Sequence, residues 1–160
     1  MQLNANDYRS AALEHLARAQ RAYEAAEYIV AHYYSGVAVE CMLRGRQCVL
    51  KTASQRKDGW YSRHDILRLA KDAHFWDWVP GDSHAEWDAR LSELNLRWSS
   101  ENRYCSEQAL RRYLVKAGLN LRKRQHGRLE YVRGNLIKHN ADRVLGLAQD
   151  IVALGEAKWK

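Results

Sequence analysis

Residues 28–44, YIVAHYYSGVAVECMLR, form the segment that decides the fold class of this chain. Written as a helix, the segment is apolar on nearly every face, and its apolar positions continue to Val49. Such a helix belongs at the centre of a bundle, because none of its sides is polar enough to face water. His32, Ser35 and Glu40 interrupt the run short of the roughly 20 apolar residues that a membrane span needs. We therefore expect a buried helix in an all-α protein and no membrane association.

Amphipathic segments lie on both sides of this central helix. Apolar residues spaced three and four apart predict one helix over 8–23 and another over 87–98. Between them, Ser62 and Asp65 resemble a capping box that opens a short helix over 66–70. Ser106 is a favourable N-cap for a further helix that we expect to continue to Leu121. The last helical pattern covers 129–154, with a kink or restart near Asn140, where the apolar stripe slips.

Length and composition indicate one domain over residues 1–160. The chain has only 9 Gly and 1 Pro, and 46% of its residues are hydrophobic, which favours helices and a sizeable core. Residues 1–7 are polar and do not resemble a signal peptide, so we expect a cytoplasmic location. Cys41 and Cys48, seven residues apart on one helix, would lie about 10 Å from each other, which predicts reduced thiols. No zinc-binding spacing is present, and we expect neither a metal nor a cofactor.

Positive charge is concentrated in one part of the chain. Residues 103–143 hold eleven basic and three acidic residues, whereas the formal net charge of the whole chain is +7. Clustered Lys and Arg gain affinity for nucleic acids by releasing counterions from phosphates, so RNA or DNA is a candidate partner. The candidate nucleic-acid-binding residues are Arg111, Arg112, Lys116, Arg122, Lys123, Arg124, Arg128 and Lys138. The alternative is that these side chains form ordinary solvated helix faces.

Three motifs together resemble the HEPN family, the helical "higher eukaryote and prokaryote nucleotide-binding" domains. The first is the helix segment 33–44, with Glu40 three residues before a Leu-Arg pair. The second is HDILRL at 64–69, similar to the family's His-x-Leu-x-x-Leu segment. The third is RWSSENRY at 97–104, which resembles the Trp-x-x-x-x-Arg-Tyr signature of one branch.

The resemblance implies an antiparallel four- to five-helix bundle that commonly forms homodimers. It covers a core of about residues 7–122, with a basic C-terminal helical elaboration over about 123–157. It also implies partners of three kinds: RNA, a nucleotide, or a protein such as a nucleotidyltransferase or an antitoxin.

Glu40 needs a polar partner, because an unpaired carboxylate in so apolar a helix would cost several kcal/mol. Arg44, His64 and Arg103, which precedes Tyr104, are the candidates. We favour Arg103, since a guanidinium can bind both carboxylate oxygens and fix the segment 97–105 to the bundle. The cluster then holds the fold together. The alternative is that the same cluster forms a nucleotide pocket.

Many HEPN proteins are metal-independent ribonucleases with an Arg followed, after four to six residues, by a His near the start of the last helix. RGNLIKH at 133–139 has that form. Arg133 would stabilise charge on the phosphate in the transition state, His139 would act as general acid or base, and Asn135 would orient the substrate. Arg133 and His139 would not share a face of a continuous helix, so the motif requires a break at Gly134 or a dimer partner. The alternative is an exposed Arg and a surface His.

Two function classes follow. The first is a metal-independent endoribonuclease of toxin or defence type. The second is a non-catalytic module that binds a nucleotide, a nucleic acid or a partner protein through the same basic surface.

Overall fold

The computed structural model describes residues 3–51, 64–119, 122–125, 128–131 and 135–159, with 122–125 and 128–131 described by their backbone alone. The described residues form six α-helices and a two-stranded antiparallel hairpin. These elements are α1 (Ala5–Glu24), α2 (Tyr28–Leu50), α3 (Ile66–Asp72), α4 (His84–Arg97), α5 (Glu107–Lys116), β1 (Arg122–Gln125), β2 (Arg128–Tyr131) and α6 (Leu136–Ala157). Short 3-10 helices η3 (Phe75–Trp78), η4 (Gly81–Ser83) and η5 (Ser100–Tyr104) lie in the connections. The body of the protein is all-α, as predicted.

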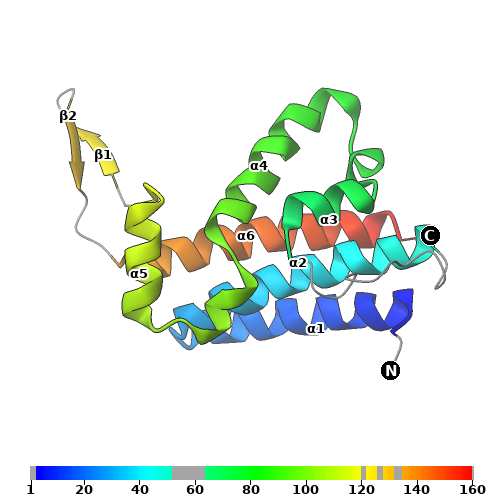
Figure 1. Ribbon diagram of the computed structural model, residues 1–160, viewed down its shortest axis with the longest axis horizontal. Coiled ribbons are helices and arrows are strands. Elements are labelled where there is room, and N and C mark those ends of the chain that lie inside the picture. Colours follow the sequence, from blue (N-terminus) through cyan, green and yellow to red (C-terminus); the bar gives the residue numbers. More distant parts are fainter. Residues whose placement is uncertain (1–2, 52–63, 120–121, 126–127, 132–134, 160) are drawn as a thin grey trace.

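Helix α2 occupies the centre of this body, next to both α1 and α6 (Figure 1). Val39, Met42 and Leu43 of α2 are fully buried in one core cluster with Val144 and Ile151 of α6. Helix α1 runs opposite to α2, whereas α6 runs in the same direction as α2, so the expected antiparallel arrangement holds for α1 and α2 but not for α2 and α6 (Figure 1). Helix α6 therefore belongs to the core and is not an elaboration on it.

Capping side chains fix where several helices begin. Asn4 accepts hydrogen bonds from the backbone N–H groups of Asn6 and Asp7, and the Asp7 carboxylate accepts one from Asn4 N. This capping box starts α1 at Ala5, three residues before the predicted helix. Asp65 is itself the N-cap of α3, while its predicted capping-box partner, Ser62, lies outside the described residues. Ser106 caps α5 as predicted.

The region between α5 and α6 differs from the prediction. Helix α5 ends at Lys116 and does not continue to Leu121, because Gly118 adopts a positive φ of 73° and Leu119 N donates to Leu114 O. This is the Schellman ending that glycine favours. Residues 122–125 and 128–131 then pair as antiparallel strands, with Gln125 opposite Arg128. The predicted helical elaboration therefore begins with a hairpin, separated in sequence by His126-Gly127.

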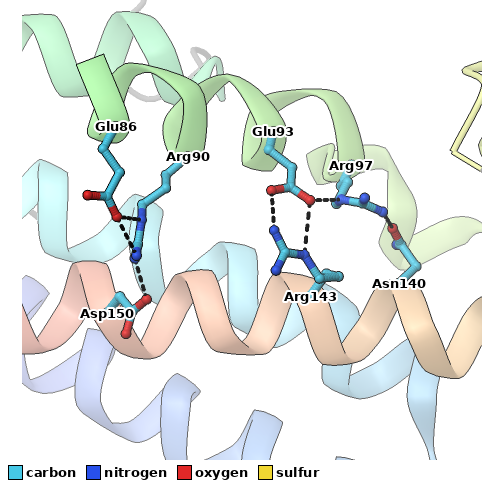
Figure 2. A network of polar contacts seen from close by, with 7 residues as sticks. All are labelled: Glu86, Arg90, Glu93, Arg97, Asn140, Arg143 and Asp150. Carbon is cyan, nitrogen blue, oxygen red and sulfur yellow. Dashed lines mark hydrogen bonds and ion pairs between the residues drawn. The ribbon is translucent and has the colours of Figure 1, made fainter. Parts of the chain in front are cut away.

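Helix α6 runs without interruption through Asn140, so the predicted restart there is wrong. Asn140 is fully buried, and its Oδ1 accepts a hydrogen bond of 2.8 Å from Arg97 Nη1 of α4. The apolar stripe slips at this position because a core site holds an amide that binds a distant arginine. Figure 2 shows the surrounding network between α4 and α6, which contains Glu86, Arg90, Glu93, Arg97, Asn140, Arg143 and Asp150.

A buried histidine extends this junction to α2. His32 is fully buried, and its Nε2–H donates to the backbone carbonyl of Arg97 over 3.0 Å. Burial lowers the pKa of His32 to about 4. One residue after Arg97, the Trp98 ring lies against Gly36 of α2, and Trp98 Nε1 donates to Tyr33 O over 3.1 Å. The hydrogen bonds of Arg97 O and of Trp98 Nε1 thus connect the C-terminal end of α4 to α2.

None of the described helices is both long enough and apolar enough to span a bilayer.

Candidate functional site

A small apolar cluster fixes α5 to the beginning of α6. Leu110 and Leu114 of α5 are fully buried against Leu136 and Ile137, the first two residues of α6. Leu110 and Leu114 are four residues apart and therefore lie on one face of α5. The other faces of α5 are left to solvent next to the start of α6.

Exposed basic side chains occupy that solvent side of α5. Arg111, Arg112 and Lys116 are all exposed, and only Arg111 has an acidic neighbour, Glu107, at 3.4 Å, among the residues the structure describes. The predicted residues Arg122, Lys123 and Arg124 lie on β1, and Arg128 lies on β2. The hairpin stands at the same end of the molecule as α5 and the start of α6 (Figure 1). We call this set, with Lys138, the basic end.

The start of α6 forms a shallow hollow at the basic end. Tyr23, Asn135, Lys138, His139 and Asp142 line this hollow, which has a volume of about 300 Å³. Asn135 is the N-cap of α6, and its side chain accepts a hydrogen bond of 3.0 Å from Lys138 N. His139 is exposed, and the hydroxyl of Tyr23 donates to Asp142 over 3.3 Å. Asn135 and His139 therefore lie on the same side of the start of α6.

The proposed catalytic pair is only half described. Arg133 and Gly134 lie outside the described residues, so the pairing of Arg133 with His139 stays a prediction. Helix α6 begins at Leu136, three residues after Arg133 in the sequence. Lys138 is a cation of the described hollow, and its Nζ lies 5.9 Å from the centre of the Tyr28 ring.

Glu40 does have polar partners, and the structure corrects their identity. Arg44 Nε donates to Glu40 Oε1 over 2.7 Å, and His64 Nδ1 donates to Glu40 Oε2 over 2.9 Å. Arg44 is almost completely buried, and the Glu40 carboxylate neutralises its charge there. Glu40 thus has the polar partners that its burial requires, and they are Arg44 and His64 in place of Arg103.

Arg103, the favoured partner, lies elsewhere. Its guanidinium lies over the ring of Tyr104, 4.5 Å from the ring centre, and both residues are exposed. The segment 97–105 is held to α2 by Trp98 instead, because the bare Cα of Gly36 lets the indole ring lie directly on the helix. Arg103 nevertheless lines the cavity that contains Glu40, Arg44 and His64.

The cysteines and the acidic groups limit the chemistry of these sites. None of the three cysteines is in a disulfide bond, and burial raises the pKa of Cys41, which lines the Glu40 cavity, to about 12. Its thiol is therefore protonated at neutral pH and is a poor nucleophile. Among the described residues, no group of three or more His, Cys, Asp and Glu side chains is arranged to hold a metal ion.

Two residues of the α6 hollow were not predicted. Asp142 follows His139 by three residues, a spacing that puts both on one helix face and could have identified it. Tyr23 comes from the end of α1, more than a hundred residues away in sequence, and no local pattern indicates it.

A scan of family models, a search of curated proteins and a search of solved structures all find no match to this chain.

Proposed function

We propose that this chain is a HEPN-type protein that binds RNA through its basic end. The single observation that carries the proposal is the apolar contact of Leu110 and Leu114 with Leu136 and Ile137. This contact places α5, whose exposed cations lie on its solvent side, next to the start of α6, the helix that carries His139. The three motifs at 33–44, 64–69 and 97–104 support the HEPN assignment, and the all-α body is compatible with it.

The basic end suits a phosphate backbone more than a small anion. Arg112 and Lys116 are four residues apart and therefore lie along one side of α5. Lys138 is exposed in the first turn of α6, where the partial positive charge of a helix N-terminus also favours phosphates. An extended row of separate cations follows successive phosphates, and sequence preference would have to come from other contacts.

The exposed side chain of His139 supports RNA cleavage as the second part of the proposed function. An exposed imidazole can take the proton of a ribose 2′-OH, so that the 2′ oxygen attacks the adjacent phosphorus. The P–O5′ bond then breaks, a proton goes to the departing 5′ oxygen, and the products are a 2′,3′-cyclic phosphate and a 5′-hydroxyl. In this scheme Lys138 and the predicted Arg133 stabilise the charge on the phosphate. The reaction requires no metal ion.

A salt titration tests RNA binding. Fluorescence anisotropy of a labelled single-stranded RNA, repeated at several salt concentrations, gives the slope of log affinity against log salt. Arg112→Gln combined with Lys116→Gln should make that slope shallower by about 1.4, since each phosphate contact contributes about 0.7. The matched control is Arg68→Gln with Lys71→Gln, which removes the same charge from exposed positions of α3. Equal effects of the two pairs would show that overall charge, and not the basic end, holds the RNA.

Cleavage is tested separately in EDTA. The intact protein should cut labelled RNA, and His139→Asn should reduce the rate at least a hundredfold while it binds RNA normally. His74→Asn, at another exposed histidine, is the control and should cut at the normal rate. An RNA with 2′-deoxyribose at the cleaved position should stay intact. If His139→Asn and the unaltered protein behave alike, the basic end only binds RNA.

A further inference from the structure

A second hollow lies where the first residues of α2, α5 and α6 come together. Its volume is about 290 Å³, slightly below the roughly 300–1,000 Å³ of typical ligand sites, so it accepts one part of a larger molecule. Its apolar walls come from Tyr28, Ile29 and Val30 in the first turn of α2 and from Ile137 in the first turn of α6. We call it the apolar hollow.

The apolar hollow and the α6 hollow are neighbours. Asn135 lines both of them. The centre of the Tyr28 ring also lies 5.4 Å from the centre of the Tyr23 ring and 5.9 Å from Lys138 Nζ, and both of these residues line the α6 hollow. A chain molecule that binds along the basic end and reaches the α6 hollow can therefore place an adjoining group in the apolar hollow.

The walls of the apolar hollow are fixed by the core but remain open to solvent. Tyr28 and Ile29 pack against the apolar cluster that joins α5 to α6. Val30 is 37% exposed, although it is a large apolar residue. A nucleobase suits such a site, because its flat faces pack on apolar and aromatic side chains that are already held in place.

The polar edge of the apolar hollow carries a carboxylate without a partner. Glu27 is the N-cap residue of α2, yet its side chain makes no capping hydrogen bond. In the part of the chain that the structure describes, no cation pairs with Glu27, whereas Glu107, the other acidic lining residue, lies 3.4 Å from Arg111. The two oxygens of Glu27 can therefore accept hydrogen bonds from a ligand.

Guanine matches this edge better than the other three bases of RNA. Its Watson–Crick edge presents two adjacent donors, N1–H and the 2-amino group, which one carboxylate can accept together. Adenine and cytosine present one amino group beside a ring nitrogen that is an acceptor, and uracil presents one N–H between two carbonyl oxygens. With these three bases an acceptor faces the second carboxylate oxygen. Such edges are readable only in an unpaired base.

We propose that the apolar hollow binds an unpaired guanine of the RNA, with the ring against Tyr28 and Val30 and the Watson–Crick edge at Glu27. This inference rests on the proposed RNA binding and adds a base preference to it. Contacts of the basic end with phosphates carry no sequence information, whereas a carboxylate that meets a base edge does.

Fluorescence anisotropy of four labelled RNAs tests the preference. All are uridine oligomers of one length, and three of them carry a single central guanosine, adenosine or cytidine. The titrations use His139→Asn, so that no RNA is cut during the measurement. The RNA with guanosine should bind about tenfold more tightly than the other three, since it alone makes two hydrogen bonds to the charged acceptor.

Glu27→Gln should abolish the preference for guanosine, because the amide replaces one acceptor oxygen with a donor. Glu14→Gln is the matched control, since it removes the same charge from an exposed position of α1 outside both hollows. The two variants should bind the all-uridine RNA with equal affinity, but only Glu14→Gln should keep the tenfold preference. Both glutamates are exposed, so neither change should alter the thermal melt.

Equal affinities for the four RNAs, or an equal preference in Glu27→Gln and Glu14→Gln, would overturn the guanine site and leave RNA binding intact. Failure of all four RNAs to bind would overturn the proposed function, and the guanine site with it.

Discussion

Arg97 of α4 and Asn140 of α6 form a buried hydrogen bond, in which the guanidinium donates to the amide oxygen over 2.8 Å. The backbone carbonyl of the same arginine accepts from His32 of α2. Three helices that are far apart in sequence therefore meet at one buried polar junction. Buried polar groups are costly to leave unpaired, which makes this junction sensitive to substitution.

Asn140→Ala should lower the free energy of unfolding by about 2–3 kcal/mol, because it leaves a nearly buried guanidinium nitrogen without its acceptor. Urea denaturation measures the change. The control is Arg143→Gln. Arg143 pairs with Glu93, as Arg97 also does, but it is more exposed, so its loss should cost less than about 1 kcal/mol. Equal decreases in the free energy of unfolding for the two variants would contradict a particular contribution of the Arg97–Asn140 hydrogen bond to stability.

Glu40→Gln should destabilise the protein by about 3 kcal/mol, since the buried Arg44 would lose the charge that neutralises it. Glu86→Gln offers a matched comparison, because Glu86 also pairs with an arginine four residues away but is far more exposed. That control should change stability by about 0.5 kcal/mol or less. Chemical denaturation at pH 7 compares them, and equal stability of the two variants would contradict a structural role for Glu40.

Gly36→Ala should lower the melting temperature clearly, because a Cβ at this position would lie 2.2 Å from the Trp98 ring. Overpacking of this kind costs about 1–3 kcal/mol, or more where the ring cannot move. Gly146→Ala should raise the melting temperature instead. Its Cβ would meet no atom within 4 Å, and it lies inside α6, so alanine should stabilise the helix by about 0.5–1 kcal/mol. A thermal melt in which both variants shift in the same direction would contradict this assignment.

Stability should fall as the pH decreases from about 6.5 to about 4, in a way that depends on His32. Burial lowers the pKa of His32 in the folded protein to about 4, whereas the unfolded chain has the ordinary value of 6.5. The unfolded state therefore binds the proton first, so stability present above pH 6.5 is progressively lost down to pH 4, by about 3 kcal/mol in all.

Denaturation curves at pH 7, 6, 5 and 4.5 measure this dependence. His32→Gln should reduce the slope over that range, at some cost in stability at pH 7. His15 also has a lowered pKa, so His15→Gln is the comparison that shows how much of the slope belongs to the less buried histidine. An unchanged slope in His32→Gln would contradict the assignment.

Helix identity was readable from the sequence because it depends on local periodicity. The apolar spacing along 8–23 and 28–49 is enough to predict α1 and α2, since each buries one or more continuous faces. The pattern predicts helices up to Leu121 and again over 129–154, whereas residues 122–125 and 128–131 form paired strands. The His126-Gly127 pair between the two strands was the available signal, since two-residue hairpin connections favour glycine.

The partners of buried polar residues were less predictable. Glu40 clearly needed a cation, but whether Arg44, His64 or Arg103 supplied it depends on how η5 lies against α2, which no local pattern encodes. Asn140 shows the same limit. Its effect on the apolar stripe was visible, whereas the arginine that explains it lies 43 residues earlier in the chain.

The indole ring of Trp98 contacts Gly36 of α2 and also lines the cavity that contains Glu40. Gly36 itself does not border the cavity, yet its missing side chain sets how deeply the ring is seated. A side chain added at Gly36 would push the Trp98 ring and so change the shape of the cavity.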